Sequence, residues 1–274
     1  VYTLKKKGRI LSMADNTSNA ERNLRQLKDE QQVRQRPAPI FGTNDEKGAF
    51  HSVEEIIANS IDEAREGYGK SISVTVEKGD IITVEDHGRG LPMDWNDKEK
   101  EWNWKLALCT LYASGKYDAS QYGKSLGLNG LGLTATQYAS SFMDVEATYD
   151  GNTRIMHFKK GRPVGDMQVV PAAKGVSGTK IRFQPDPEVF PALSKINLDS
   201  TMFIPVLNSQ AMLQDGLEIL FSHYDFDNQV KRFYYEKGMA EFVDAILEDN
   251  KILPQAAMYF DKESGTDVPD DLEN

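Results

Sequence analysis

The sequence contains very little cysteine and no long apolar run. Among its 274 residues Cys109 is the one cysteine, so no disulfide can form within the chain and a disulfide-stabilised scaffold is excluded. Cys109 lies in the apolar stretch 106–111, which favours a thiol packed in the core over a nucleophile. No stretch is apolar for long enough to cross a bilayer, and the basic residues 1–12 lack the apolar centre of a signal peptide. We therefore predict a cytoplasmic protein that does not associate with membranes.

Basic residues are also in deficit. The chain has 32 Lys and Arg against 42 Asp and Glu, a net charge of −10 at pH 7. Affinity for duplex DNA comes mainly from neutralising phosphates, so we expect this chain to bind DNA weakly by itself. Its 39% hydrophobic and 27% charged residues are typical of a globular domain. The length suits one large domain and part of another.

The first pattern with chemical content is helical. Apolar and small residues recur at helical spacing and predict one buried helix face: Val53, Ile56, Ile57, Ser60, Ile61 and Ala64. Glu55, Asn59 and Glu63 fall one turn apart on the other side of that helix. A carboxylate and a carboxamide stacked in this way can hold a water with one and a magnesium ion with the other. Taken alone, acidic residues on a helix more often form a solvated face, so the segment needs support from the rest of the chain.

Three further segments carry glycines or hydroxyls at sharp turns. After a predicted hairpin, residues 86–90 (Asp-His-Gly-Arg-Gly) describe a loop that turns close to a ligand. Residues 123–132 form a glycine-rich loop that leads into a helix, where exposed amides suit a polyphosphate. Residues 177–183 form a turn that feeds a strand, with the hydroxyl of Thr179 at its mouth. Each pattern is common by itself, and the glycine-rich loop matches neither a Walker P-loop nor a Rossmann fingerprint.

In this order and spacing the four segments resemble the GHKL ATPase superfamily and, within it, the B subunits of bacterial type II topoisomerases. The similarity includes residues 33–37, which match the start of that family's first strand and loop, and extends through residues 234–238 to about residue 260. Other branches of the superfamily are less similar. Sensor histidine kinases lack the glutamate found here at position 55, and chaperone and mismatch-repair ATPases have different lids.

The resemblance implies a role for each matching residue. Glu55 is expected to be the general base that activates the attacking water, and Asn59 to bind the magnesium ion that bridges the phosphates of ATP. Asp86 is expected to read adenine by accepting from its exocyclic amine, with Thr179 helping through its hydroxyl and a water. Further contacts with the nucleotide are expected from residues of the base pocket, the phosphate loop and the lid: Glu63, Gly88, Arg89, Gly90, Pro92, Lys116, Tyr122, Gly127, Leu128, Asn129, Gly130, Leu131 and Gly132.

The resemblance also implies a drug site at the base pocket. The loop 88–90 is expected to line that pocket, with Arg89 and Pro92 at its mouth. In relatives, aminocoumarin antibiotics overlap the adenine site, and an arginine one strand over grips the coumarin ring. Here the turn 148–151 places Tyr149 at that position. Tyrosine can stack but lacks the guanidinium fork, so we predict weaker binding of this drug class. Tyr149→Arg should then tighten drug binding without changing ATP affinity.

The architecture implied is α/β, a GHKL (Bergerat-type) two-layer sandwich whose mixed, mainly antiparallel sheet has helices on one face. We expect residues 1–32 to be an N-terminal tag or extension and a dimerisation arm, residues 33–237 the ATPase domain, and residues 238–274 the start of a truncated transducer domain. Helices are expected at 52–67, 104–114, 131–141, 198–213 and 239–249. Strands are expected at 72–76, 81–84, 142–149, 153–159, 167–171, 179–184, 217–222, 230–235 and 256–260, with a loop at 95–104.

The function implied is ATP binding and hydrolysis with Mg²⁺ in a type II DNA topoisomerase, where it drives gate closure and strand passage. The implied partners are a second copy of the same subunit on nucleotide binding, an A-type cleavage subunit, and DNA in the complete enzyme. As an excised fragment, the chain is expected to hydrolyse ATP poorly. The alternative is a nucleotide-binding GHKL regulator, or a chaperone-like or mismatch-repair-like ATPase. Glu55 favours the hydrolysing enzyme, because a pure binder has no use for a base at that position.

Overall fold

The computed structural model describes residues 27–112, 131–195, 197–227 and 229–243. Its helices are α2 (Asp29–Gln35), α3 (Ala38–Phe41), α4 (Glu46–Arg65), α5 (Asn103–Cys109), α6 (Gly132–Tyr138) and α7 (Ser200–Met212), with 3-10 turns η2 (Pro191–Ser194) and η3 (Tyr224–Phe226). Its strands are β1 (Ser71–Glu77), β2 (Ile81–Asp86), β3 (Trp95–Asn96), β4 (Glu101–Trp102), β5 (Ser140–Tyr149), β6 (Asn152–Lys159), β7 (Arg162–Pro163), β8 (Gln168–Pro171), β9 (Gly178–Pro185), β10 (Glu218–His223) and β11 (Val230–Tyr234).

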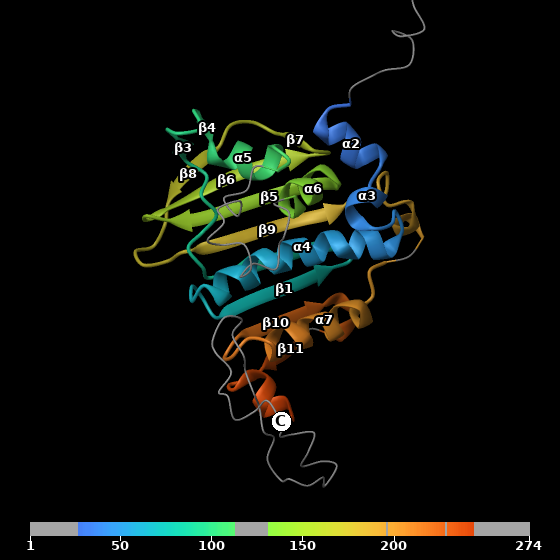
Figure 1. The fold of residues 1–274 in the computed structure, drawn as a ribbon, viewed down its shortest axis with the longest axis vertical. Helices are drawn as coiled ribbons and strands as arrows, with labels where there is room; N and C mark the ends of the chain where they lie inside the picture. The colour runs from blue at the N-terminus through green and yellow to red at the C-terminus, as the bar shows by residue number, and fades with distance from the viewer. Residues whose placement is uncertain (1–26, 113–130, 196, 228, 244–274) are drawn as a thin grey trace, which may run out of the picture.

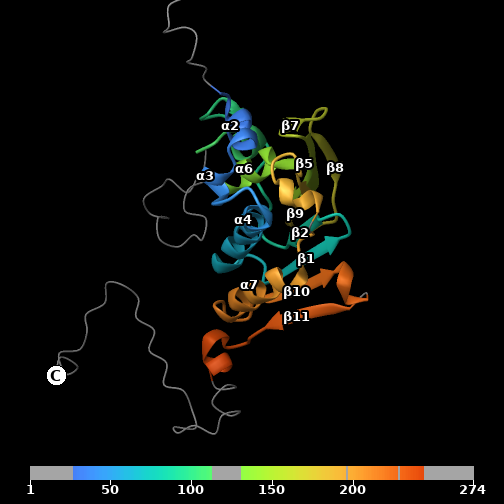
Figure 2. The same ribbon diagram turned by 90° about the vertical axis from the view of Figure 1, so that its right-hand side faces the viewer.

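Within these residues one sheet of nine strands forms a layer, and the helices lie against one of its faces (Figure 1; Figure 2). The strand order is β11-β10-β1-β2-β9-β5-β6-β7, and β8 also pairs with β6. Every pair in the sheet is antiparallel except β1 with β10, which are parallel. The predicted α/β architecture, with a mixed, mainly antiparallel sheet covered on one face, is therefore confirmed.

Helix α4 lies across the middle of the sheet and supplies much of the core. Alternate residues of β1, β2 and β10 are buried, as expected for strands with one covered face. The predicted apolar stripe of α4 is buried along its whole length. Its isoleucines at 56, 57 and 61 are at most 2% exposed, and burying each such side chain contributes roughly 1.5–3 kcal/mol. The same packing brings Asn59 and Glu63 of α4 close to Asp86 at the C-terminal end of β2.

The predicted strand order along the chain is largely confirmed, with shifts of one or two residues at the ends. The predicted start of α4 was wrong by six residues, because Asp45 caps the helix ahead of its apolar stripe. Helix α5 ends at Cys109 and not at 114, since Thr110 adopts extended dihedral angles. Helix α6 likewise ends three residues before the predicted boundary, where β5 begins.

Residues 33–37 were predicted to begin a strand, and this was wrong. Val33 and Arg34 belong to helix α2, and Pro37 precedes the single turn α3. Val33 is fully buried in the core. The Arg34 guanidinium donates to the Tyr138 carbonyl (2.9 Å) and pairs with Asp186 (2.6 Å). The helical backbone thus directs Val33 into the core and the adjacent Arg34 towards the Tyr138 carbonyl and Asp186.

Residues 95–104 were predicted as a loop, but they contain a small hairpin. Strands β3 and β4 pair, with Trp95 opposite Trp102. The two indole rings meet edge to face, with centroids 5.7 Å apart, a preferred aromatic geometry. The arm at 1–26 and the predicted strand 256–260 lie outside the described residues. Helical residues 238–243 agree with the start of the predicted helix at 239–249. No helix in the described part of the chain is long and apolar enough to cross a membrane.

Candidate functional site

Helix α4 positions three of the predicted site residues. The Asp45 carboxylate begins the helix by accepting from two backbone N–H groups of its first turn, at 3.0 and 3.3 Å. With one face of its 20 residues buried, the register of the helix is fixed. Glu55, Asn59 and Glu63 therefore stand one turn apart on one flank, with Glu55 against the start of α6 and Glu63 against the loop after β2.

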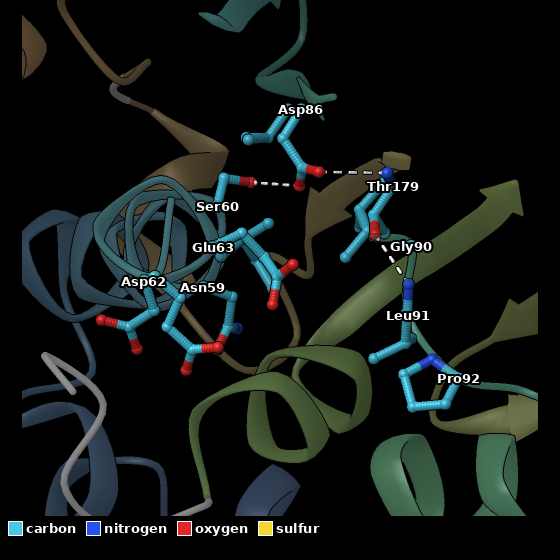
Figure 3. A pocket seen from close by; sticks show the side chains of 13 residues that line it. Asn59, Ser60, Asp62, Glu63, Asp86, Gly90, Leu91, Pro92 and Thr179 are labelled. Carbon is cyan, nitrogen blue, oxygen red and sulfur yellow. Dashed lines mark hydrogen bonds between the residues drawn. The ribbon is translucent and has the colours of Figure 1, made fainter. Parts of the chain in front are cut away.

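A cavity of about 130 Å³ opens between α4 and the strands β2 and β9 (Figure 3). Its lining residues come from α4, β2, the loop that follows β2, and β9: Ile56, Asn59, Ser60, Asp62, Glu63, Glu66, Val84, Asp86, Gly90, Leu91, Pro92, Thr179 and Ile181. Six residues predicted from the sequence are thus brought together here: Asn59, Glu63, Asp86, Gly90, Pro92 and Thr179. Gly88, Arg89 and Glu55 are not among the lining residues and lie beside the cavity.

Asp86 is a buried carboxylate of the cavity that three hydrogen bonds hold in place. It is 6% exposed, and its Oδ2 accepts from the Ser60 hydroxyl at 2.8 Å (Figure 3). Its Oδ1 accepts from the backbone N–H groups of Gly88 (2.9 Å) and Thr179 (3.2 Å). Burial raises the pKa of Asp86 above its ordinary value, and these three hydrogen bonds counter part of that rise. Because each carboxylate oxygen has two lone pairs, Oδ2 keeps one for a donor on a ligand.

Thr179 joins β9 to the loop after β2. Its N–H donates to Asp86, and its hydroxyl oxygen accepts from the Leu91 N–H at 2.9 Å (Figure 3). Leu91 and Ser60 were not singled out from the sequence. Ser60 lies in the apolar stripe of α4, so the sequence indicates only that it is buried. The structure shows that its hydroxyl donates to the Asp86 carboxylate on β2.

Glu55 lies where α4 meets the start of α6. Its Oε1 is 3.4 Å from Nε2 of His51, one turn earlier on the helix. A Cβ atom on Gly132 would lie 1.8 Å from the other carboxylate oxygen. A side chain at that position would have to displace the Glu55 carboxylate. His51 was missed in the sequence, although its spacing of four residues from Glu55 was a signal for a side-chain pair.

Asn59 has a fixed carboxamide. Its Nδ2 donates to the Glu55 carbonyl at 2.9 Å, which leaves the carboxamide oxygen as the atom able to bind a metal. Among the described residues no group of three or more His, Cys, Asp or Glu side chains could hold a metal ion by itself. A single oxygen ligand fits Mg²⁺, which commonly takes its other ligands from phosphates and waters.

Arg89 is held at the end of α4. Its Nε and Nη2 donate to the two carboxylate oxygens of Glu63 at 3.0 and 2.8 Å, and Nη2 also contacts Glu66. Its guanidinium carbon lies 4.1 Å from the ring centroid of Tyr68. The hydrogen bond with Glu63 is the main reason that the pKa of Arg89 is raised. The predicted contact of Arg89 with a ligand would therefore compete with two carboxylates.

Several predicted site residues lie outside the described part of the chain: Lys116, Tyr122, Gly127, Leu128, Asn129 and Gly130. Leu131 and Gly132, the last two residues of the predicted phosphate loop, are described. Leu131 precedes α6 and Gly132 is its first residue. The described end of that loop therefore lies against the Glu55 carboxylate.

Comparisons with known proteins agree with this geometry. Residues 44–188 match the family described as Histidine kinase-, DNA gyrase B-, and HSP90-like ATPase. The DNA gyrase B protein of Mycoplasmoides gallisepticum is 31% identical over 240 residues, which cover 86% of this chain and 36% of that relative. The DNA topoisomerase 4 B protein of Staphylococcus aureus is 32% identical over 237 residues, which cover 86% of this chain and 35% of the relative.

A solved structure is similar as well. The 43K ATPase domain of Thermus thermophilus gyrase B, in complex with an aminocoumarin, superimposes with a TM-score of 0.68 at 28% sequence identity. The match covers 81% of this chain and 56% of that one. The chain thus spans 35–36% of the length of the two curated relatives from Mycoplasmoides and Staphylococcus.

Proposed function

The chain belongs to the histidine kinase-, DNA gyrase B- and HSP90-like ATPase family, and from this premise we propose that its cavity binds ATP and that Glu55 activates the hydrolytic water. The observation that carries the proposal is the arrangement on α4. Glu55 lies one turn from Asn59, and the first residue of α6 contacts its carboxylate. A base, a metal ligand and the end of a phosphate loop are thereby in reach of one bound polyphosphate.

Each residue then has a distinct task. Asp86 accepts from the amine of the adenine ring, while Ser60 and Thr179 keep its carboxylate oriented. Glu55 takes the proton of the attacking water. Asn59 is the residue that would hold a magnesium ion bound with the nucleotide, and that ion would neutralise phosphate charge. The lid residues expected to contact the phosphates, Lys116 among them, complete the site in this proposal.

For the complete protein we propose the ATP-hydrolysing subunit of a type II DNA topoisomerase. The proposal is supported by relatives named as the corresponding subunits of DNA gyrase and DNA topoisomerase 4. ATP binding would close a dimer of these subunits, and the A-type subunit would cleave the DNA through which a second duplex passes. This activity belongs in the cytoplasm. A regulator that binds nucleotide without hydrolysis is less well supported, because it would not need Glu55.

We also propose that the cavity is a target for aminocoumarins, since the similar gyrase B structure contains one. Asp86 would supply the acceptor. Arg89 was expected to contact ligands at the mouth of the pocket. Its guanidinium is instead already bound by Glu63 and Glu66. An inhibitor that needs this arginine has to displace a carboxylate first.

The decisive experiment separates binding from hydrolysis. Glu55→Ala should leave ATP affinity nearly unchanged, because the carboxylate acts on the water, and should lower turnover in the complete protein by about 10²–10⁴-fold. Calorimetry on this chain and a steady-state phosphate assay on the complete protein measure the two effects. Glu54→Ala, the same change one residue along α4, is the matched control.

Two outcomes would contradict the proposal in different ways. If Glu55→Ala kept a tenth or more of the parental rate, Glu55 would not be the base. If the parental chain showed no ATP binding, the cavity would not be a nucleotide site.

A further inference from the structure

The loop that follows β2 forms one wall of the cavity. Gly90, Leu91 and Pro92 line the cavity, and residues 93 and 94 continue the loop to β3. Two side-chain oxygens anchor its main chain. The Leu91 N–H donates to Thr179, and the Met93 N–H donates to the Tyr149 hydroxyl, both at 2.9 Å. The position of this wall therefore depends on one hydroxyl from β9 and one from β5.

The hydroxyl of Tyr149 is used twice. Besides accepting from Met93, it donates to Oδ2 of Asp94 at 3.0 Å. The ring of Tyr149 lies over the guanidinium of Arg154, whose Cζ is 3.7 Å from the ring centroid. The tyrosine is thus held by a cation on its face and by two hydrogen bonds at its tip.

Arg154 fixes the other side of this cluster. It is 7% exposed, and its Nε and Nη2 donate to the two carboxylate oxygens of Asp94 at 3.1 and 2.8 Å. Its Nη1 donates to the main-chain oxygens of Tyr149 (2.6 Å) and Asn152 (3.1 Å). Such a bidentate pair has one preferred geometry, so Asp94 holds a defined place at the end of the β5–β6 hairpin.

The loop also lies directly on the end of β5. A Cβ atom on Gly90 would be 2.6 Å from the Thr148 carbonyl oxygen and 3.1 Å from the Tyr149 ring. Gly90 has a φ of +86°, which side chains other than glycine rarely adopt. Gly90 in the cavity wall therefore packs too closely against Thr148 and Tyr149 to leave room for a side chain.

We infer that Tyr149, Asp94 and Arg154 form a positioning cluster for the nucleotide pocket. The cluster holds residues 90–94 against the β5–β6 hairpin, so that Leu91 and Pro92 meet the base in one fixed place. Tyr149 acts through the Met93 N–H and does not itself bind the nucleotide. The inference rests on the proposed function, because it concerns the same pocket.

One expectation from the sequence changes as a result. Tyr149→Arg was expected to tighten aminocoumarin binding and leave ATP affinity unchanged. Arginine has no acceptor, so it cannot replace the hydroxyl that receives the Met93 N–H, and it would place a second guanidinium beside that of Arg154. We now expect Tyr149→Arg to weaken ATP binding.

The test removes the hydroxyl alone. Tyr149→Phe keeps the ring over Arg154 and leaves the Met93 N–H without its acceptor, so affinity for a non-hydrolysable ATP analogue with Mg²⁺ should fall roughly five- to twentyfold. Tyr234→Phe, the same change on the edge strand β11, is the control and should stay within about twofold of the parental chain. Asp94→Asn should weaken binding too, and the double variant Tyr149→Phe, Asp94→Asn should lose less than the product of the two single effects.

A local measurement separates positioning from general destabilisation. In Tyr149→Phe, amide hydrogen exchange of Leu91, Met93 and Asp94 should speed up while the amides of α4 and β10 keep their protection. Unchanged affinity in Tyr149→Phe, or faster exchange spread evenly over the chain, would overturn the inference. If Tyr149→Phe does not fold, Asp94→Asn decides by the same two measurements. Failure of the parental chain to bind the analogue would instead refute the proposed function.

Discussion

At the scale of single residues, Asp86 carries both recognition and local structure. Asp86→Asn replaces an oxygen by an NH₂ group that must face either Ser60 and the ligand amine, or two backbone N–H groups. We expect a loss of about 1–3 kcal/mol in ATP affinity, the range for an unmatched buried polar group. Calorimetry measures the loss directly.

Asp80→Asn is a control for this change. Asp80 is also buried, and its carboxylate accepts from the Leu198 N–H, away from the cavity. That variant should lose stability and keep its ATP affinity. Equal affinities for the Asp86→Asn variant and the parental chain would show that Asp86 only holds the end of its strand.

Cys109 offers a test of burial that depends on pH. Burial raises the pKa of its thiol to about 11, so about one molecule in a thousand carries the thiolate at pH 8. Because only the thiolate reacts, we expect alkylation by iodoacetamide to be slow at pH 8 and to keep accelerating up to about pH 11. Labelling of the chain in urea, where the pKa returns to its ordinary value, is the reference. A native labelling rate that levels off near pH 9 would contradict the burial of the thiol.

At the scale of secondary-structure elements, helix α2 is attached to the body by ion pairs of different exposure, from Arg34 to Asp186 and Glu188 and from Glu30 to Arg162. Arg34 pairs with Asp186, whose side chain is 3% exposed, whereas Arg162 is 72% exposed where it pairs with Glu30. Arg34→Met should lower the free energy of unfolding by about 3–5 kcal/mol, because it leaves a buried carboxylate without its cation.

The matched change Arg162→Met should cost at most about 1 kcal/mol, as usual for a surface pair. Urea unfolding of both variants, with unchanged m-values, provides the comparison. Similar losses in the two variants would show that the buried pair is not what attaches α2.

The elements that could be predicted from the sequence are those with a clear period. The stripe of α4 and the alternation in β1, β2 and β10 depend on which face is buried, and residue order alone shows this. The helical end of α2, at residues 33–35, and the β3–β4 hairpin could not be predicted in the same way. Their formation depends on partners distant in sequence or opposite in a short hairpin, such as Asp186 for Arg34 and Trp102 for Trp95.

The same distinction holds within the site. Asp86, Asn59 and Thr179 were predicted because they belong to local motifs, and the fold brings them to one cavity. The roles of Ser60 and Tyr149 were not visible in the sequence. The Ser60 hydroxyl donates to Asp86 on another element, and the Tyr149 hydroxyl accepts from the Met93 N–H of a distant loop. Because these partners meet only in the folded protein, the residues next to Ser60 and Tyr149 in the sequence do not indicate the contacts.

At the scale of the whole molecule, the net charge limits how tightly the chain can bind nucleic acid. A net charge of −10 opposes binding to a polyanion. We expect affinity for a 20–30 base-pair duplex to be no tighter than non-specific binding, about 10⁻⁴–10⁻⁶ M at physiological salt.

Fluorescence anisotropy over a salt series tests this expectation. A shallow dependence on salt would agree with few phosphate contacts. Submicromolar binding with a steep salt dependence would mean that a local basic surface outweighs the total charge, and the expectation that this chain binds DNA weakly by itself would fail.

The parallel pair of β1 and β10 has a consequence for how the protein is made. During synthesis β1 leaves the ribosome early, and its hydrogen-bonding edge waits until residues 218–223 have been translated. Until then the nascent chain exposes an unpaired strand rich in β-branched residues, a surface that invites pairing with other chains. The half of the sheet that holds Asp86 can pair through β2, β9 and β5 earlier, because those strands are contiguous in the sheet and precede β10 in the chain. The strands that carry Asp86 and Thr179 can therefore pair before β10 reaches the sheet, and until then the open edge of β1 is the part most exposed to pairing with other chains.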